Sequence, residues 1–261
     1  MIKMKSRKRQ LELIDKLLTM MDHLRLKCPW DKKQTFETLR TLTIEETHEL
    51  SEAILEKDLN GIKSELGDLL LHIMFYSRIA SEQNEFDIGD VTEAICDKLI
   101  YRHPHIYGTV KVKNEDDVKR NWETLKLKEG NNSIFSGIPS SLPEMIKSHR
   151  LQDKAAGVGF EWKRLEDVWG KVKEEENEFL NAIKENNKSS IEEEFGDLIF
   201  SLINYARFIN IDPDMALKKT NKKFVDRFKK MEKSAKSEKT SIESLSLDDL
   251  NNLWEKAKKN I

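Results

Sequence analysis

Apolar residues recur along this chain at the spacing of one helix face. Near the N-terminus, Leu11, Ile14, Leu17, Leu18 and Met21 lie on one side of a helical turn pattern, which is typical of an amphipathic helix with one buried face. The same periodicity predicts helices over 10–27, 36–58, 61–82, 88–102, 115–129, 143–155, 164–186, 190–210, 213–233 and 247–259. Residues that favour β-strands are concentrated only at 107–112, and this segment is too short to form a β-sheet. The pattern therefore predicts an all-α protein.

The residues that break secondary structure support this prediction and divide the chain. No proline falls inside a predicted helix, since two of the five stand at a first helical residue and the others lie between helices, and the chain contains 29 Leu but only 8 Val, a bias toward helix formers. The segment 130–142 is rich in Gly, Asn, Ser and Pro, as expected of a linker. We therefore expect an N-terminal helical domain over 1–129, a linker over 130–142 and a C-terminal helical domain over 143–261.

The balance of charges in the chain argues against two classes of protein. Charged residues make up 35% of the chain, but 45 Lys and Arg nearly balance 47 Asp and Glu. This balance argues against an acidic disordered chain and against a basic protein that binds nucleic-acid polymers. No apolar run approaches the length of a membrane span, and the basic N-terminus lacks the apolar core of a signal peptide. We expect a cytoplasmic protein with neither a membrane nor a nucleic-acid polymer as partner.

The two halves of the chain contain a repeat. When 45–78 is shifted by 129 positions it falls without gaps on 174–207, and 13 of the 34 positions are identical. Both copies have the form Glu-Glu-x-x-Glu, fifteen residues, then Glu-x-x-Asp. A repeat of this length is a domain duplication rather than a solenoid period. The sequence therefore predicts tandem helical-bundle domains.

The repeated acids predict a metal site in each copy. Residues three apart share a helix face, and a short turn between two helices makes them pack antiparallel. Four carboxylates then converge, and the usual partner of such a group is a hard divalent cation, Mg²⁺ first and Mn²⁺ as the alternative. The expected ligands are Glu175, Glu178, Glu194 and Asp197 in the second copy, and Glu46, Glu49, Glu65 and Asp68 in the first.

Two other interpretations of these acids fit the residues less well. A Glu-rich helix face is often only solvated surface, but here both Asp68 and Asp197 lie between apolar residues, where unpaired acids are costly. A di-iron site would need the Glu-x-x-His element in both copies. The first copy has it at Glu45 and His48, whereas the second has Asn177 at the matching position. The residues therefore favour the Mg²⁺ site over a di-iron site.

The tandem acidic pattern resembles the MazG family of nucleoside triphosphate pyrophosphohydrolases, in its two-copy bacterial form. Further local matches are Cys28-Pro29-Trp30-Asp31-Lys32, Gln34-Thr35-Phe36, Glu65-Leu66-Gly67-Asp68-Leu69-Leu70, Arg102-His103-Pro104-His105 and Gly157-Val158-Gly159-Phe160-Glu161-Trp162. The resemblance covers essentially the whole chain. It implies an all-α bundle, a homodimer, Mg²⁺ dependence and hydrolysis of NTPs and dNTPs to the monophosphate and pyrophosphate.

The resemblance also implies residues for binding the nucleotide. In the second copy these are Lys171, Lys223, Arg227, Trp254 and Lys258, and the corresponding first-copy positions are Lys98, Arg102, Trp122 and Lys126. The cations would hold phosphates and Trp254 would stack on the base. The chain departs from the family at Ser190, where Lys is common, and the first copy has Leu42 in place of Lys171. We therefore expect the second copy to be the principal catalytic site.

The expected reaction is hydrolysis at the α-phosphorus. Glu174 or Glu175 would orient the attacking water as the catalytic group, although the sequence does not separate a base from a metal ligand. Two alternatives stay open at this point. One is a non-catalytic helical protein whose acidic faces bind a partner. The other is a house-cleaning pyrophosphatase restricted to one non-canonical nucleotide.

Overall fold

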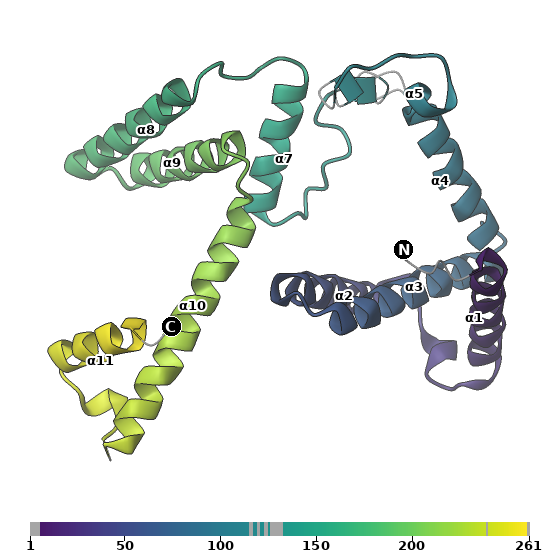
Figure 1. Cartoon of the computed structure of the whole chain (residues 1–261), viewed down its shortest axis with the longest axis horizontal. Helices are drawn as coiled ribbons and strands as arrows, with labels where there is room; N and C mark the ends of the chain where they lie inside the picture. Colours follow the sequence, from purple (N-terminus) through teal and green to yellow (C-terminus); the bar gives the residue numbers. More distant parts are fainter. Residues whose placement is uncertain are drawn as a thin grey trace. The chain divides into compact units, whose positions relative to one another are not determined.

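The described part of the protein is all-α, as the sequence predicts. The computed structural model describes residues 6–114, 117–118, 121–122, 125, 133–238 and 240–259. Within these ranges every regular element is a helix and no strand is present (Figure 1). None of the described helices is both long and apolar enough to cross a membrane.

The helices divide into two compact units, one ending at Lys111 and the other beginning at Val112. This division lies ahead of the predicted linker at 130–142. Residues 126–132, with most of the helix predicted over 115–129, lie outside the described residues. In the later part of the linker, the Lys154 ammonium donates to the Ile134 carbonyl oxygen at 2.7 Å, which ties this segment to the second unit. The domain limits at 129 and 143 stay predictions.

The first unit is built around a helical hairpin. Its elements are α1 (Arg7–Lys27), the 3₁₀ turn η1 (Asp31–Lys33), α2 (Phe36–Glu56), α3 (Leu59–Glu82), α4 (Ile88–Arg102) and α5 (Pro104–Tyr107). Helices α2 and α3 pair along their length, and α1 packs across α3. The core consists of Met21, Leu39, Phe75 and Ile79, one or two from each of these three helices. Their burial fixes the register between α2 and α3, and therefore which acids of the two helices face one another.

The second unit repeats the hairpin and adds a second helix pair. Its elements are α7 (Glu144–Gly157), α8 (Leu165–Glu185), α9 (Lys188–Phe208), α10 (Pro213–Ser237), the 3₁₀ turn η2 (Ile242–Ser244) and α11 (Leu247–Lys259). Helices α8 and α9 form the hairpin, and α10 pairs with α11. A core of Met231, Ala235, Leu253 and Ala257 joins α10 to α11.

The two hairpin turns have the same geometry at equivalent positions. Lys57 closes α2 with φ 57°, and Asn186, 129 positions later, closes α8 with φ 54°. Asp58 and Asn187 then cap the next helix through their side chains. The duplication seen in the sequence is therefore also present in the backbone. Each turn is short enough to hold its two helices antiparallel.

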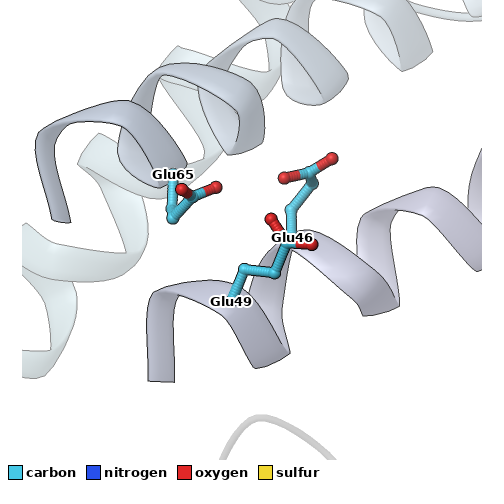
Figure 2. A group of neighbouring side chains, drawn as sticks. All are labelled: Glu46, Glu49 and Glu65. Atoms are coloured by element: carbon cyan, nitrogen blue, oxygen red, sulfur yellow. The ribbon is translucent and has the colours of Figure 1, made fainter. Parts of the chain in front are cut away.

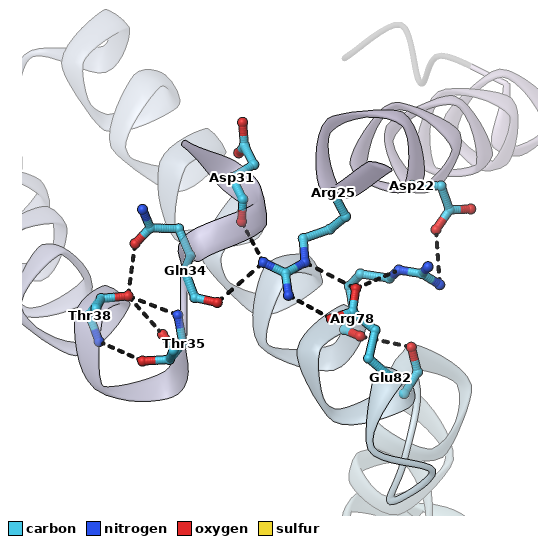
Figure 3. A network of polar contacts seen from close by, with 9 residues as sticks. Asp22, Arg25, Asp31, Gln34, Thr35, Thr38, Arg78 and Glu82 are labelled. Atoms are coloured by element: carbon cyan, nitrogen blue, oxygen red, sulfur yellow. Dashed lines mark hydrogen bonds and ion pairs between the residues drawn. The ribbon is translucent and has the colours of Figure 1, made fainter. Parts of the chain in front are cut away.

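A polar network fastens the segment after α1 to the first hairpin (Figure 3). The Arg25 guanidinium donates to the backbone oxygens of Asp31 and Gln34 and to the carboxylate of Glu82 at the end of α3. Thr35 caps α2 by a reciprocal pair of hydrogen bonds with Thr38. The Cys-Pro-Trp-Asp segment, which follows α1, is thus connected to α3 through Arg25, whose guanidinium binds both the Asp31 carbonyl oxygen and Glu82.

Candidate active site

The hairpin α8–α9 brings the second-copy acids together. Carboxylate oxygens of Glu174, Glu175 and Glu178 lie within 4.8 Å of one another, as do those of Glu175, Glu194 and Asp197. Glu175 belongs to both groups and is the buried member, with 6% of its surface exposed. The expected convergence of acids from two helices is therefore present. A set made only of carboxylate oxygens is the donor set of a hard divalent cation.

A lysine on the same helix neutralises part of this cluster. The Lys171 ammonium lies 2.7 Å from Oε1 of Glu174 and 2.5 Å from Oε1 of Glu175. These charge-assisted hydrogen bonds, to Glu174 first and then to Glu175, hold the pKa of Lys171 well above its ordinary value. The lysine was expected to reach the triphosphate, but its pairing with the acids was missed. The i, i+3 and i, i+4 spacing along α8 was the signal for it.

The acids from α9 have no such neutralisation. Burial raises the pKa of Glu194, and the negative charges of Glu178, Asp197, Glu175 and Glu193 raise it further. In the part of the chain that the structure describes, no cation forms an ion pair with Glu194. The cluster is therefore electrostatically unfavourable by itself, and a bound cation would relieve the repulsion.

The hairpin α2–α3 forms a comparable cluster in the first copy (Figure 2). Glu46 and Glu49 extend from one helix and Glu65 from the facing one, with carboxylate oxygens within 4.8 Å of one another. Asp68 lies near enough to act on Glu46: burial raises the pKa of Glu46 most, followed by the charges of Asp68, Glu49 and Glu65. All four predicted first-copy acids therefore share one region.

Comparison with known proteins places both hairpins in one family. The model of the MazG nucleotide pyrophosphohydrolase domain matches the chain twice, over 34–107 and over 165–232. The chain belongs to the MazG family. It is 41% identical over 251 residues to the nucleoside triphosphate pyrophosphohydrolase/pyrophosphatase MazG of Thermotoga maritima, covering 94% of this chain and 96% of that protein. It is 37% identical over 255 residues to the nucleoside triphosphate pyrophosphohydrolase of Escherichia coli K12, covering 94% and 97%.

Each MazG segment contains one complete acidic cluster. The segment 34–107 holds the four acids of the first copy, and 165–232 holds those of the second together with Lys171. A third relative, the YabN protein of Bacillus subtilis, is 43% identical over 235 residues, which cover 88% of this chain and 48% of that protein. The resemblance identified from the sequence is thereby confirmed.

A second group of predicted residues meets on α10 and α11, partly beyond the second MazG segment. The guanidinium carbon of Arg227 lies 5.6 Å from the centre of the Trp254 ring. Phe224 also contacts Trp254, and the two ring centres lie 5.2 Å apart. Phe224 was not expected here, although it lies three residues before Arg227 and so shares its helix face. This arrangement combines an aromatic face with a cation.

The remaining predicted nucleotide-binding residues lie on α10 and α11. Lys223 is exposed on α10, and Lys258 on α11 pairs with Glu255 at 2.5 Å. Among the described residues, no hydrogen bond or ion pair joins this group on α10 and α11 to the acids of α8 and α9. The roles of these residues therefore stay predictions.

The first-copy nucleotide residues are brought together less completely. Lys98 is exposed and Arg102 half-buried, both on α4 within the first MazG segment. Trp122 is described as half-buried and falls in the second unit, whereas Lys126 lies outside the described residues. Leu42, at the position of Lys171, is half-buried and packs against the core of the first unit. No cation among the described residues forms an ion pair with the first cluster.

Proposed function

We propose that the protein is a nucleoside triphosphate pyrophosphohydrolase that releases pyrophosphate from NTPs and dNTPs. One observation carries the proposal: in each MazG segment, carboxylates from the two helices of a hairpin converge, those of Glu46, Glu49 and Glu65 in the first and those of Glu175, Glu194 and Asp197 in the second. The relatives from Thermotoga maritima and Escherichia coli, which align over nearly their whole length, are named for this activity.

The acids suit a divalent metal, for which we propose Mg²⁺, with Mn²⁺ as a substitute. The donors are carboxylate oxygens alone, and burial, followed by the surrounding negative charges, raises the pKa of Glu194. In the second copy Glu175, Glu178, Glu194 and Asp197 would hold the ion. When bound, the ion would supply charge neutralisation for the triphosphate oxygens and for the pyrophosphate that leaves.

The chain's own residues would direct the hydrolysis. Glu174 or Glu175 accepts a hydrogen bond from a water and orients it toward the α-phosphorus. A bond forms between the water oxygen and that phosphorus, and the bond to the α–β bridging oxygen breaks. The electron pair leaves on pyrophosphate, and the proton of the water passes to a nearby carboxylate. The products are the nucleoside monophosphate and pyrophosphate.

Binding of the nucleotide would use cations and the aromatic pair. Lys171, Lys223, Arg227 and Lys258 are the proposed phosphate contacts. The Trp254 ring beside Arg227 offers a stacking face that accepts any base. We favour the second copy as the catalytic one because Lys171 is present there, whereas Leu42 removes that cation from the first copy.

We further propose that the protein is a homodimer. The hairpins leave large apolar side chains uncovered, including Phe195 on α9, which is 50% exposed, and Leu66 on α3, which is 54% exposed. Large apolar side chains exposed on a helix face are typical of a surface that associates, and a second copy would complete each hairpin as a bundle. Light scattering after size-exclusion chromatography should give twice 30.5 kDa. A mass of one chain at micromolar concentration would contradict the dimer.

Product analysis tests the proposed activity. The protein is incubated with ATP or dGTP and Mg²⁺, and the phosphorus products are separated. Pyrophosphate with the monophosphate supports the proposal, whereas orthophosphate with the diphosphate contradicts it. No hydrolysis would instead favour a non-catalytic acidic interaction protein. A panel of bases and sugars addresses the restricted house-cleaning alternative, because activity within a few-fold across the panel would exclude it.

A further inference from the structure

Lys171 forms an ion pair with Glu175, the residue that belongs to both carboxylate groups of the second copy. Its ammonium lies 2.5 Å from Oε1 of Glu175, the buried member of the cluster, and 2.7 Å from Oε1 of Glu174. Contacts this short are charge-assisted hydrogen bonds. In the described residues no cation pairs with Glu178, Glu194 or Asp197. The lysine therefore satisfies one end of the cluster and leaves the other open.

We propose that Lys171 competes with the metal for Glu175, and that transfer of its ammonium to the triphosphate is what opens the second site. An oxygen of Glu175 that accepts from an ammonium is not free to bind a cation at the same position, and two adjacent cations repel each other. Metal entry therefore requires the lysine to move. A triphosphate offers the displaced ammonium new anionic partners, so metal and nucleotide favour each other's binding. The inference rests on the proposed function, which supplies the metal and the triphosphate.

The first copy provides the comparison within the same chain. Its cluster has the equivalent acids on the equivalent hairpin, α2–α3, but Leu42 stands at the position of Lys171 and packs against the core. None of its acids is paired with a cation among the described residues. Metal alone should therefore bind the first cluster more tightly than the second. A metal site that loads without nucleotide and one that loads with it would then coexist in one chain.

The experiment measures Mg²⁺ binding by calorimetry on the full chain, without nucleotide. The first cluster is silenced by combining Glu46→Gln with Asp68→Asn, so that only the second cluster titrates. In this background Lys171→Met, which keeps a long unbranched side chain but removes its charge, should raise the Mg²⁺ affinity about 10-fold, the effect of losing one charge-assisted hydrogen bond.

Lys173→Met is the matched control. Lys173 is an exposed lysine of the same helix, two residues along, with no ion pair in the described structure. Its substitution removes the same charge from α8 and should change the Mg²⁺ affinity less than about 2-fold, because its field is screened by salt. Equal effects of the two substitutions would mean a general charge effect and would overturn the inference.

A converse variant tests the first cluster. Leu42→Lys, with the second cluster silenced by Asp197→Asn, should weaken Mg²⁺ binding to the first cluster. Because Leu42 packs against the core, circular dichroism must first show that this variant is folded, and Lys171→Met decides the question if it is not. An unchanged affinity in Lys171→Met overturns the inference but leaves the proposed reaction standing, since product analysis tests that separately. Absence of Mg²⁺ binding in every variant would overturn both.

Discussion

Arg25 binds both carboxylate oxygens of Glu82, with Nε 3.0 Å from Oε1 and Nη2 2.6 Å from Oε2. The two residues are 57 positions apart in the sequence and join the end of α1 to the end of α3 (Figure 3). The Arg25 side chain is only 8% exposed, so solvent screens this pair less than a surface ion pair. Two parallel hydrogen bonds also fix its geometry.

Substitution of Arg25 should destabilise the first unit. Arg25→Met removes the paired hydrogen bonds and leaves Glu82 and two backbone oxygens without this donor. We expect a loss of about 2–3 kcal/mol in the free energy of unfolding at neutral pH. Chemical denaturation monitored by circular dichroism measures it. Arg78→Met is the control: its contacts are longer, 3.3 Å to Asp22 and 3.5 Å to Glu82, and it should cost about 1 kcal/mol or less.

The contribution of Arg25 to the stability of the protein should decrease as the pH falls. Hydrogen bonds from Arg25 hold the pKa of Glu82 below its ordinary value. The pair therefore contributes its full stability above the ordinary pKa of glutamate, and the contribution is lost as the pH falls through the lowered pKa. The difference in stability between wild type and Arg25→Met should shrink on acidification. A difference that stays constant to acid pH would contradict this account.

The contribution of Glu194 to stability should depend on pH in the opposite direction. Burial and the surrounding acids raise its pKa, so ionisation of Glu194 costs stability in the folded protein. Glu194→Gln should leave the melting temperature in EDTA unchanged below the ordinary pKa of glutamate. As the pH rises through the raised pKa, the variant should become more stable than wild type. Glu192→Gln, an exposed neighbour, serves as control and should show no such rise.

The helices and the acidic clusters were predictable because both depend on local spacing. Helices expected over 36–58 and 164–186 are found as Phe36–Glu56 and Leu165–Glu185. The convergence of acids follows from i, i+3 spacing on two helices joined by a short turn. These features need only the period of a helix and the direction of the chain.

Features that depend on side-chain choice or on distant partners were not predictable. The helical spacing lets Lys171 reach Glu174 and Glu175, but it does not decide between these carboxylates and a phosphate as the partner, and the structure shows the pairing with the carboxylates. The left-handed conformation of Lys57 carries no sequence signal, because lysine does not favour positive φ. Arg25 finds Glu82 through the tertiary packing of α1 on α3, which no local pattern specifies.

The aromatic pair on α10 and α11 predicts a binding phenotype. Trp254→Ala removes the proposed stacking face and should raise the KM for ATP roughly 5- to 150-fold, the range for loss of one base–aromatic stack. The kcat should change little, because stacking is the same in the ground and transition states. Trp254→Phe keeps an aromatic ring against Phe224, and its KM for ATP should lie between those of the wild type and Trp254→Ala. Unchanged KM in folded Trp254→Ala would exclude the stacking role.

Variants of the two clusters should differ in activity. Glu175→Gln or Asp197→Asn should abolish most pyrophosphate release at saturating Mg²⁺, because each removes a charged oxygen from the second cluster. Glu46→Gln and Asp68→Asn change the equivalent acids of the first cluster and should leave most of it. Steady-state rates of the four variants decide the matter. If the first-cluster variants lose activity and the others keep it, the catalytic site has been assigned to the wrong copy.

The most direct test of the account is hydrolysis of ATP in water enriched in oxygen-18, with mass spectrometry of both products. The account places the water on the α-phosphorus, so the label should appear in the nucleoside monophosphate and pyrophosphate should remain unlabelled. The Glu175→Gln variant should release little of either product. Label in the pyrophosphate, or labelled orthophosphate as the main product, would contradict the proposed reaction.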